Sequence, residues 1–297
     1  MSNVKFKITI ILLFSLLNTP VFGQDKKSAN QNESSYLSAS VNFISDAVFM
    51  GRKDSISAPY LYPSLLYHHK SGLYAKGSFS YLTKSDESRI DLYLLTAGID
   101  FNIKNFYGDI SATKYFFNDK SYNVISEVEA DITASLLYDF KIVNLSLGAS
   151  TYFSKNSNND IFLSSEISHD FITSDKAFQI SPTAGIYLGS QNFYEQYYIY
   201  NRFGSRSGLG KGNGPGGSGS EQVINTEVVL EESEKFGVMA YEFSLPMWYT
   251  INSFTFSFLP VLAIPQNEAT LTVDEEVFKE ELDETFYWMV GIAYRFD

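Results

Sequence analysis

Three carboxylates occupy alternate positions in one short stretch of the sequence: Glu127, Glu129 and Asp131. Alternate side chains of an extended chain point to the same side, so these three are expected to form a ladder with steps of about 7 Å. Such a ladder attracts cations, and a pair of carboxylates can also hydrolyse a glycosidic bond. The sequence indicates no aromatic cleft that would hold a sugar beside them. The ladder therefore favours an electrostatic role over a catalytic one.

Residues for other kinds of chemistry are scarce. The chain of 297 residues has no cysteine and three histidines, which excludes disulfides, thiolate metal sites and a cysteine nucleophile. His69 and Ser71 have the His-x-Ser spacing of a membrane phospholipase, in which the histidine serves as base for the serine. Here, however, both residues lie in a predicted tight turn. We therefore predict no enzyme activity, no metal site and no cofactor.

The N-terminus has the three-part order of a secretory signal. Met1–Lys7 is short and basic, Ile8–Leu17 is an apolar run of ten residues, and small residues lead to Gly23. The apolar run is too short to span a membrane, which takes about 20 residues. We predict a signal peptide over 1–23 and a short periplasmic tail over 24–35.

The remaining chain alternates between polar and apolar residues with a period of two, which is typical of strands. In 286–296, for example, Phe286, Val290 and Ile292 share one face and Tyr287 and Ala293 the other. The predicted strands are 36–49, 59–69, 72–83, 89–102, 105–116, 125–140, 143–154, 160–172, 176–189, 236–250, 253–264 and 285–296.

Connections between these strands alternate between short and long, with very long ones at 190–235 and 265–284. Tight turns at one end and long loops at the other are typical of a bacterial outer-membrane barrel. A soluble β-sandwich also alternates, but its polar face would be the outer one. We predict an all-β chain: a transmembrane antiparallel up-and-down β-barrel of about 12 strands over 36–297, in the outer membrane of a Gram-negative bacterium, with extracellular loops at 190–235 and 265–284.

The polar face of the strands would line the barrel interior. Besides the carboxylate ladder, the alternation places these charged residues inside, among many Ser and Thr: Asp46, Lys76, Asp109, Glu166, Glu242 and Arg295. One interpretation is a hydrated, negatively charged lumen that favours cations or neutral polar solutes. The alternative is a closed interior in which the carboxylates pair with Lys76, Arg295 and hydroxyl groups.

Aromatic residues gather at the ends of the apolar faces, where rings suit the headgroup level of a membrane. They include Phe49, Tyr67, Phe106, Phe116, Phe171 and Tyr249. The last strand ends in Tyr294-Arg295-Phe296, which resembles the assembly signal of outer-membrane proteins. We expect contacts with outer-membrane lipid and lipopolysaccharide, and with the barrel-assembly machinery during biogenesis. The net charge of −12 argues against a nucleic-acid partner.

Two early segments carry a more particular resemblance. Residues 41–51, VNFISDAVFMG, are similar to an SDY-F-RG opening, and 63–74, PSLLYHHKSGLY, to a P-x-L-x-Y stretch followed by a Ser-Gly-aromatic turn. Together they resemble the TorF-like porin family over about 40 residues, departing from it at Met50 and Arg52. The resemblance implies a small outer-membrane barrel with a pore role.

The long loops suggest further contacts. Residues 204–220 are rich in glycine and predict a flexible linker. The flanking stretches 192–201 and 222–230 are predicted to pair as a hairpin, whose Tyr194, Tyr197, Tyr198 and Tyr200 are candidates for contact with a sugar or a protein partner. Residues 273–284 are acidic, with apolar residues at helical spacing, and predict a short amphipathic helix over the mouth.

Two functions fit these features. The first is a channel for small polar or cationic solutes, whose loops restrict the mouth. The second is a non-conducting surface or scaffold barrel whose 190–235 loop binds an extracellular or membrane protein.

Overall fold

The computed structural model describes residues 34–54, 56–155, 158–197, 228–231, 236–268, 270–273, 276–280 and 282–296. The predicted signal peptide, 1–23, and the glycine-rich stretch 204–220 lie outside the described residues. Among the described residues no helix is both long and apolar enough to cross a membrane.

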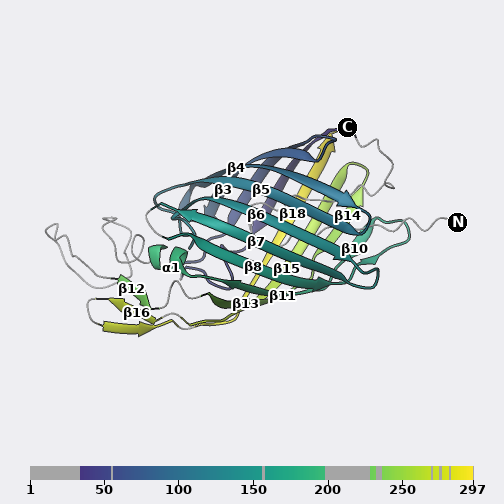
Figure 1. The fold of residues 1–297 in the computed structure, drawn as a ribbon. Coiled ribbons are helices and arrows are strands. Elements are labelled where there is room, and N and C mark those ends of the chain that lie inside the picture. The colour runs from purple at the N-terminus through teal and green to yellow at the C-terminus, as the bar shows by residue number, and fades with distance from the viewer. Residues whose placement is uncertain are drawn as a thin grey trace.

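The described residues form a closed antiparallel barrel of 12 strands, as the sequence predicts (Figure 1). Its strands are β1 (Tyr36–Ile44), β2 (Tyr60–His68), β3 (Leu73–Lys84), β4 (Glu87–Ile103), β5 (Phe106–Phe117), β6 (Val128–Asp139), β7 (Asn144–Ser154), β8 (Asp160–Ser168), β11 (Thr183–Gly189), β13 (Gly237–Ser244), β15 (Phe254–Pro265) and β18 (Thr285–Phe296). Neighbours in this order pair with one another; β1 pairs with β18, and β13 with β15, so no sheet edge is left open along the barrel.

Three of the barrel strands are interrupted near their tight-turn ends. β8 continues as β9 (Phe171–Ile172), β11 is preceded by β10 (Phe178–Ile180), and β13 continues as β14 (Met247–Ile251). Pro182 and Pro246 stand in two of these breaks, and proline has no N–H to donate to the sheet. Backbone bonds to the carbonyls of both prolines bridge the breaks, so the wall continues across them.

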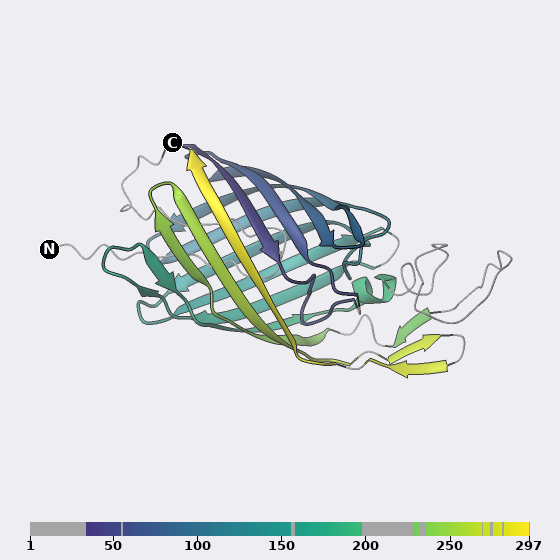
Figure 2. The same ribbon diagram turned by 180° about the vertical axis from the view of Figure 1, so that it is seen from behind.

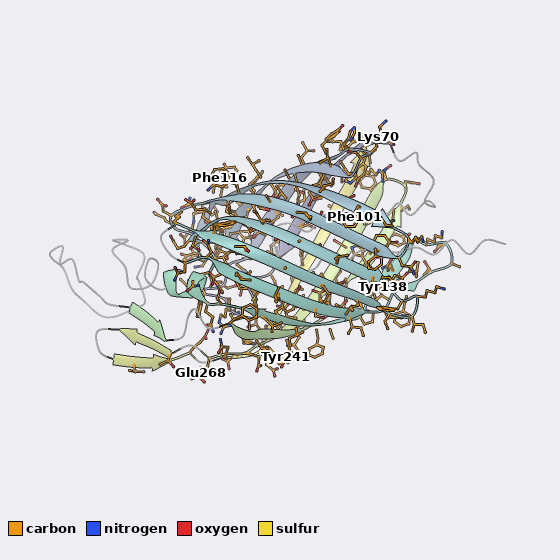
Figure 3. All side chains as sticks on the ribbon, viewed as in Figure 1. Lys70, Phe101, Phe116, Tyr138, Tyr241 and Glu268 are labelled. Atoms are coloured by element: carbon orange, nitrogen blue, oxygen red, sulfur yellow. The ribbon has the colours of Figure 1, made fainter. Side chains whose placement is uncertain are left out.

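The two faces of the wall differ as the alternation predicts. On β18, Phe286 is 63% exposed and Val290 42%, whereas Tyr287 is 1% exposed and faces the interior. Exposed aromatic rings lie at or near the ends of strands, among them Tyr67, Phe106, Phe116, Phe171 and Tyr249. Figure 3 shows Phe116 toward one end of the barrel and Phe101 toward the other. An apolar outer face with aromatic rings at its ends suits a barrel surrounded by lipid.

The predicted secondary structure of the long loops is wrong in two places. Residues 192–197 form the helix α1 (Asn192–Tyr197), and β12 (Val228–Glu231) pairs with β16 (Thr270–Val273) rather than with the 192–201 stretch. Residues 273–284 contain no helix among those described; β16 instead forms a hairpin with β17 (Glu276–Lys279). β-Branched residues in both segments favour this extended conformation. The small sheet lies beyond the end of the barrel that carries α1, opposite the end of β18 (Figures 1 and 2).

Candidate functional site: the barrel interior

Hydroxyl groups cover much of the inner wall in the half of the barrel nearest the tight turns. They bond across neighbouring strands: Ser40 to Ser64 at 2.7 Å, Thr96 to Thr113 at 3.2 Å and Thr133 to Ser150 at 2.8 Å between hydroxyl oxygens. Each bond joins residues that face one another in the strand register, or nearly so. These six hydroxyl groups of the wall therefore satisfy one another locally, as polar groups shielded from water generally do.

Asp131 lies on this inner wall and is 2% exposed. Its carboxylate accepts hydrogen bonds from the hydroxyls of Tyr115 and Thr133, each at 2.7 Å. Two hydroxyl donors stabilise a buried carboxylate without cancelling its charge. Asp131 therefore contributes negative potential to the interior.

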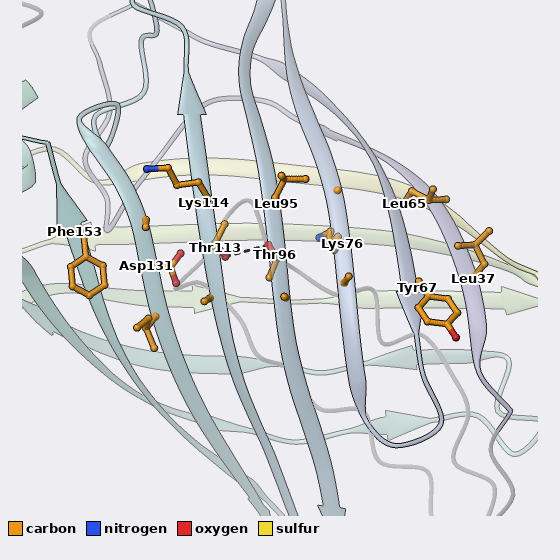
Figure 4. Close-up of a pocket in the computed structure, with 16 residues that line it drawn as sticks. Leu37, Leu65, Tyr67, Lys76, Leu95, Thr96, Thr113, Lys114, Asp131 and Phe153 are labelled. Atoms are coloured by element: carbon orange, nitrogen blue, oxygen red, sulfur yellow. Dashed lines mark hydrogen bonds between the residues drawn. The ribbon is translucent and has the colours of Figure 1, made fainter.

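The predicted ladder of three carboxylates does not form, because Glu129 points the other way. The register between β6 and β7 shifts between Val128 and Ala130, and this irregularity turns Glu129 to the outer face. There its carboxylate pairs with Lys114 Nζ at 3.3 Å, and both side chains are nearly half exposed. Figure 4 shows the contrast: Lys114 leaves the wall outward, whereas Thr113 and Asp131 lie behind it.

Two other predicted lumen residues serve the loops instead. Asp46 follows β1 and is 7% exposed; its Oδ1 accepts from the N–H groups of Ala47 and Ala58, and its Oδ2 pairs with Lys53 at 3.0 Å. It thereby ties together the two ends of the loop between β1 and β2. Glu127 is buried in the turn before β6 and so lies outside the strand that carries Asp131.

The remaining predicted residues belong to inner-face positions. Asp109, Glu166 and Glu242 are each 4% exposed, on β5, β8 and β13. Lys76 lies opposite Thr96 in the β3–β4 register, and Arg295 places its guanidinium 4.0 Å from the centre of the Tyr36 ring. With Asp131, the wall thus carries four of the predicted carboxylates and two of the predicted cations, an acidic balance.

The other half of the interior is filled by an apolar plug. It forms where the loop between β1 and β2 folds into the barrel mouth; we call the described residues of this loop, 45–54 and 56–59, the inserted loop. At its tip Phe49 and Arg52 exchange two backbone hydrogen bonds, of 2.8 and 2.9 Å. Met50 and Gly51 between them both have positive φ, 49° and 77°, the conformation of a type I′ turn. A Cβ on Gly51 would lie 2.9 Å from the side chain of Pro265, the last residue of β15. The absence of a side chain at Gly51 therefore lets the tip of the loop approach Pro265.

Phe49 is at the centre of the plug and is 3% exposed, although its place in the sequence predicted an aromatic residue of the outer girdle. Its ring packs edge-on against Phe162 of β8 and Phe193 of α1, and lies 5.9 Å from the ring of Tyr152. The inserted loop therefore reaches across the mouth to the far wall (Figure 2). Other members of the plug are Ile44, Val48, Met50, Tyr60, Tyr62, Leu82, Leu92, Leu94, Tyr115, Val124, Ile125, Tyr187, Met239, Val261 and Tyr287.

Arg52 anchors the inserted loop to the long loop after β15. Its side chain is 1% exposed; Nε lies 3.2 Å from Glu280 Oε1, and Nη2 donates to Glu280 Oε2 at 3.2 Å. Nη2 also donates to the carbonyls of Gln266 and Asn267, at 3.0 and 2.9 Å. The planar fork of arginine suits this combination of a carboxylate and carbonyls.

Helix α1 completes the plug. Asp160 at the start of β8 accepts from the N–H groups of Asn192 and Phe193, at 2.9 and 2.7 Å, and so fixes the beginning of the helix. Tyr194 is 5% exposed, with the Arg52 guanidinium 5.5 Å from its ring centre. Tyr194 is therefore buried against Arg52 and does not lie on the exposed hairpin that the sequence predicted.

Tyr198 and Tyr200 lie outside the described residues, and the structure describes only the backbone of Tyr197. Among the described residues no group of three or more His, Asp or Glu side chains is placed to hold a metal ion.

The outer face also has a groove, of about 720 Å³, across β1 to β7. Its floor is formed by small residues on adjacent strands, Ala75, Ala97 and Ala112, which face one another in the register. Leu37 and Tyr67 rise at one end and Phe153 at the other (Figure 4). The groove opens on the outer face of the barrel.

Sequence reasoning missed the residues that close the barrel. The alternation ended β1 at residue 49, whereas β1 ends at Ile44 and the next residues fold inward. The one local signal was Gly51, just after the predicted strand, because glycine readily adopts the positive φ of a turn.

Comparison with known proteins gives similarity at the level of the fold. No family model matches the chain, and no curated protein does. Solved barrels do: the KdgM porin at 9% identity and TM-score 0.45, over 88% of this chain and 99% of that one; the NanC porin at 10% and 0.46, over 87% and 98%; and the COG4313 outer membrane channel from Pseudomonas putida F1 at 10% and 0.45, over 92% and 100%. Two of these neighbours are porins and the third is an outer membrane channel.

Proposed function

We propose that this protein is an outer-membrane channel for small polar or cationic solutes, and that the inserted loop closes it in the conformation described. The observation that carries the proposal is the division of the interior. A wall of hydroxyls and carboxylates, including Asp131, Asp109 and Glu166, lies below an apolar plug that belongs to loops and not to the wall alone. An acidic inner wall favours cations over anions once water can enter.

Few polar contacts among the described residues hold the inserted loop to the rest of the barrel mouth. Arg52 provides the ion pair with Glu280, and Thr285 donates to the Gly51 carbonyl at 3.0 Å. Displacement of the inserted loop would therefore leave the barrel wall, with its continuous strand pairing, in place. This separation between the wall and the inserted loop is what a gated channel requires. The proposed pore role also agrees with the resemblance of residues 41–74 to the TorF-like family, which remains a prediction.

Planar-bilayer recordings test the proposal directly. The full chain is compared with a variant in which residues 47–57 are replaced by a short Gly-Ser linker. We expect low conductance from the full chain, and from the variant a stable conductance that favours cations. Folding of both barrels is checked by their heat-dependent mobility on a gel. A variant that folds and yet does not conduct would contradict the channel.

A non-conducting surface barrel is the second candidate, and the apolar packing of the plug favours it. The sheet of β12, β16 and β17 beyond the barrel end offers a place for a partner (Figure 1). Deletion of residues 202–221 should then abolish capture of the partner by the intact barrel. Unchanged capture would count against this second candidate.

A further inference from the structure

Two buried glutamates face one another across a glycine on the inner wall. Gly185 on β11 is paired with Glu166 on β8 and, on its other side, with Glu242 on β13. A Cβ on Gly185 would lie 3.1 Å from Glu166 Cγ and 3.0 Å from Tyr187 Cε2. Because glycine has no side chain, the Tyr187 ring and the Glu166 stem lie directly over it, between the strands that carry the two glutamates.

No positive charge among the residues that the structure describes compensates this pair. Each glutamate is 4% exposed, and in the described part of the chain no Lys, Arg or His nitrogen lies within ion-pairing distance of either carboxylate. The Tyr187 hydroxyl donates to Glu166 Oε1, whereas Glu242 Oε2 has no hydrogen-bond partner. The two carboxylates also repel one another. Two buried carboxylates are costly unless a proton or a cation joins them.

Tyr287 adds an independent observation. It enters from β18, is 1% exposed, and its hydroxyl has no hydrogen-bond partner. Glu242 is the charged group with which this hydroxyl interacts electrostatically. A buried hydroxyl without a partner is rare, and its oxygen is a hard, neutral ligand for a metal ion.

We propose that Glu166 and Glu242 bind a divalent cation, with the Tyr287 hydroxyl as a third oxygen ligand and water molecules as the others. Two carboxylates balance the charge of a divalent ion, and oxygen ligands select Ca²⁺ or Mg²⁺ over softer metals. Ca²⁺ suits the site best, because it accepts irregular sets of oxygen ligands. The site has only two carboxylates, fewer than the three acidic or histidine ligands of a typical metal cluster. Because affinity falls with fewer charged ligands, we expect weak binding like that of extracellular Ca²⁺ modules, with a Kd of about 10⁻⁴–10⁻³ M.

The site lies where the apolar plug meets the polar wall, since Tyr187 and Tyr287 belong to the plug and the two glutamates belong to the wall. A bound cation would join β8 and β13, which β11 separates. The proposal does not depend on conduction, because binding is measured on the closed barrel.

Terbium luminescence tests the site. Tb³⁺ is added to the refolded full chain in detergent free of lipopolysaccharide, and tyrosine is excited. We expect a saturable signal that Ca²⁺ displaces, and at least a tenfold weaker affinity in Glu166→Gln and in Glu242→Gln. Glu129→Gln, which alters an outward carboxylate, is the matched control and should bind like the unchanged chain.

Two further variants separate ligand loss from misfolding. Gly185→Ala keeps both carboxylates and places a methyl group against the Glu166 stem and the Tyr187 ring, so we expect weaker binding from a barrel that still folds. Tyr287→Phe should weaken binding several-fold and leave it saturable. The proposal would be overturned if the unchanged chain and a Glu166→Gln, Glu242→Gln double variant bound Tb³⁺, and likewise Ca²⁺, with the same affinity. The absence of saturable binding would also overturn it. In either case a shared proton would hold the two glutamates together.

Discussion

The two halves of the barrel interior differ in the side chains that fill them: one half is polar and the other apolar. Toward the tight turns the inner wall consists of Ser, Thr and carboxylates that bond to their neighbours on adjacent strands. Toward the long loops the same strands present Tyr60, Tyr115, Tyr152 and Phe162, which pack against the inserted loop. The change occurs within single strands: on β7, Ser150 and Tyr152 are inner-face neighbours. The strand sequences therefore encode the closure as much as the loop does.

The contacts of the two halves also differ in range. The bond between Thr96 and Thr113 joins facing residues of adjacent strands, whereas Arg52 binds Glu280, 228 positions away. Contacts in the plug thus depend on the whole barrel being closed. We expect single substitutions there to have larger effects than substitutions in the polar half.

The largest effect is expected for Arg52→Ala. The substitution removes a buried fork that pairs with Glu280 and two carbonyls, and it takes the arginine away from a largely buried carboxylate. Breaking such a buried pair costs about 3–5 kcal/mol, measured here as a lower free energy of unfolding in urea. The matched control is Lys53→Ala, because the Lys53 side chain is 42% exposed and pairs with Asp46. A surface pair contributes about 0–1 kcal/mol, and equal losses in the two variants would refute the anchoring role.

Phe49→Ala should have the next largest effect. Removal of a fully packed phenyl ring costs about 3–5 kcal/mol, part of it from the cavity left behind. We expect this loss in urea unfolding, together with a rise in bilayer conductance, because the ring spans the mouth between Phe162 and Phe193. Phe286→Ala on the outer face is the control and should leave conductance unchanged. A stable, equally closed Phe49→Ala barrel would show that other residues hold the plug.

Asp131 and Glu129 permit a comparison across the wall. The two carboxylates are two positions apart in the chain but face the interior and the lipid side respectively. In the barrel whose inserted loop has been replaced, we expect Asp131→Asn to reduce cation selectivity, measured as a shift of the reversal potential in a salt gradient. Glu129→Gln should leave the reversal potential unchanged. Equal shifts would indicate that the lumen potential does not originate from the inner wall.

Much of this fold could be predicted because alternation with a period of two is a local property. The last strand was predicted as 285–296, which are the bounds of β18. The inserted loop and the reversal of Glu129 could not be predicted in this way, since one depends on contacts with β8 and α1 and the other on a bulge against β7. A shift of one residue exchanges the two faces of a strand, so alternation places a carboxylate correctly only up to the nearest bulge. The pair of Glu166 and Glu242 was predicted to face inward, but its meeting across Gly185 requires the register of three strands.

The smallest effect is expected at the tight turns, where the polar half ends. Lys104 joins β4 to β5 with a φ of 57°, a conformation that costs a residue with a side chain more than it costs glycine. Lys104→Gly relieves this strain but makes the unfolded chain more flexible, so the two effects largely cancel. We expect the free energy of unfolding to change by less than about 1 kcal/mol. Gly51→Lys in the plug is the reverse substitution, at a φ of 77°, and places a side chain against Pro265. We expect it to lower the free energy of unfolding by more than Lys104→Gly changes it, and an equal or smaller loss would contradict the difference between the two halves.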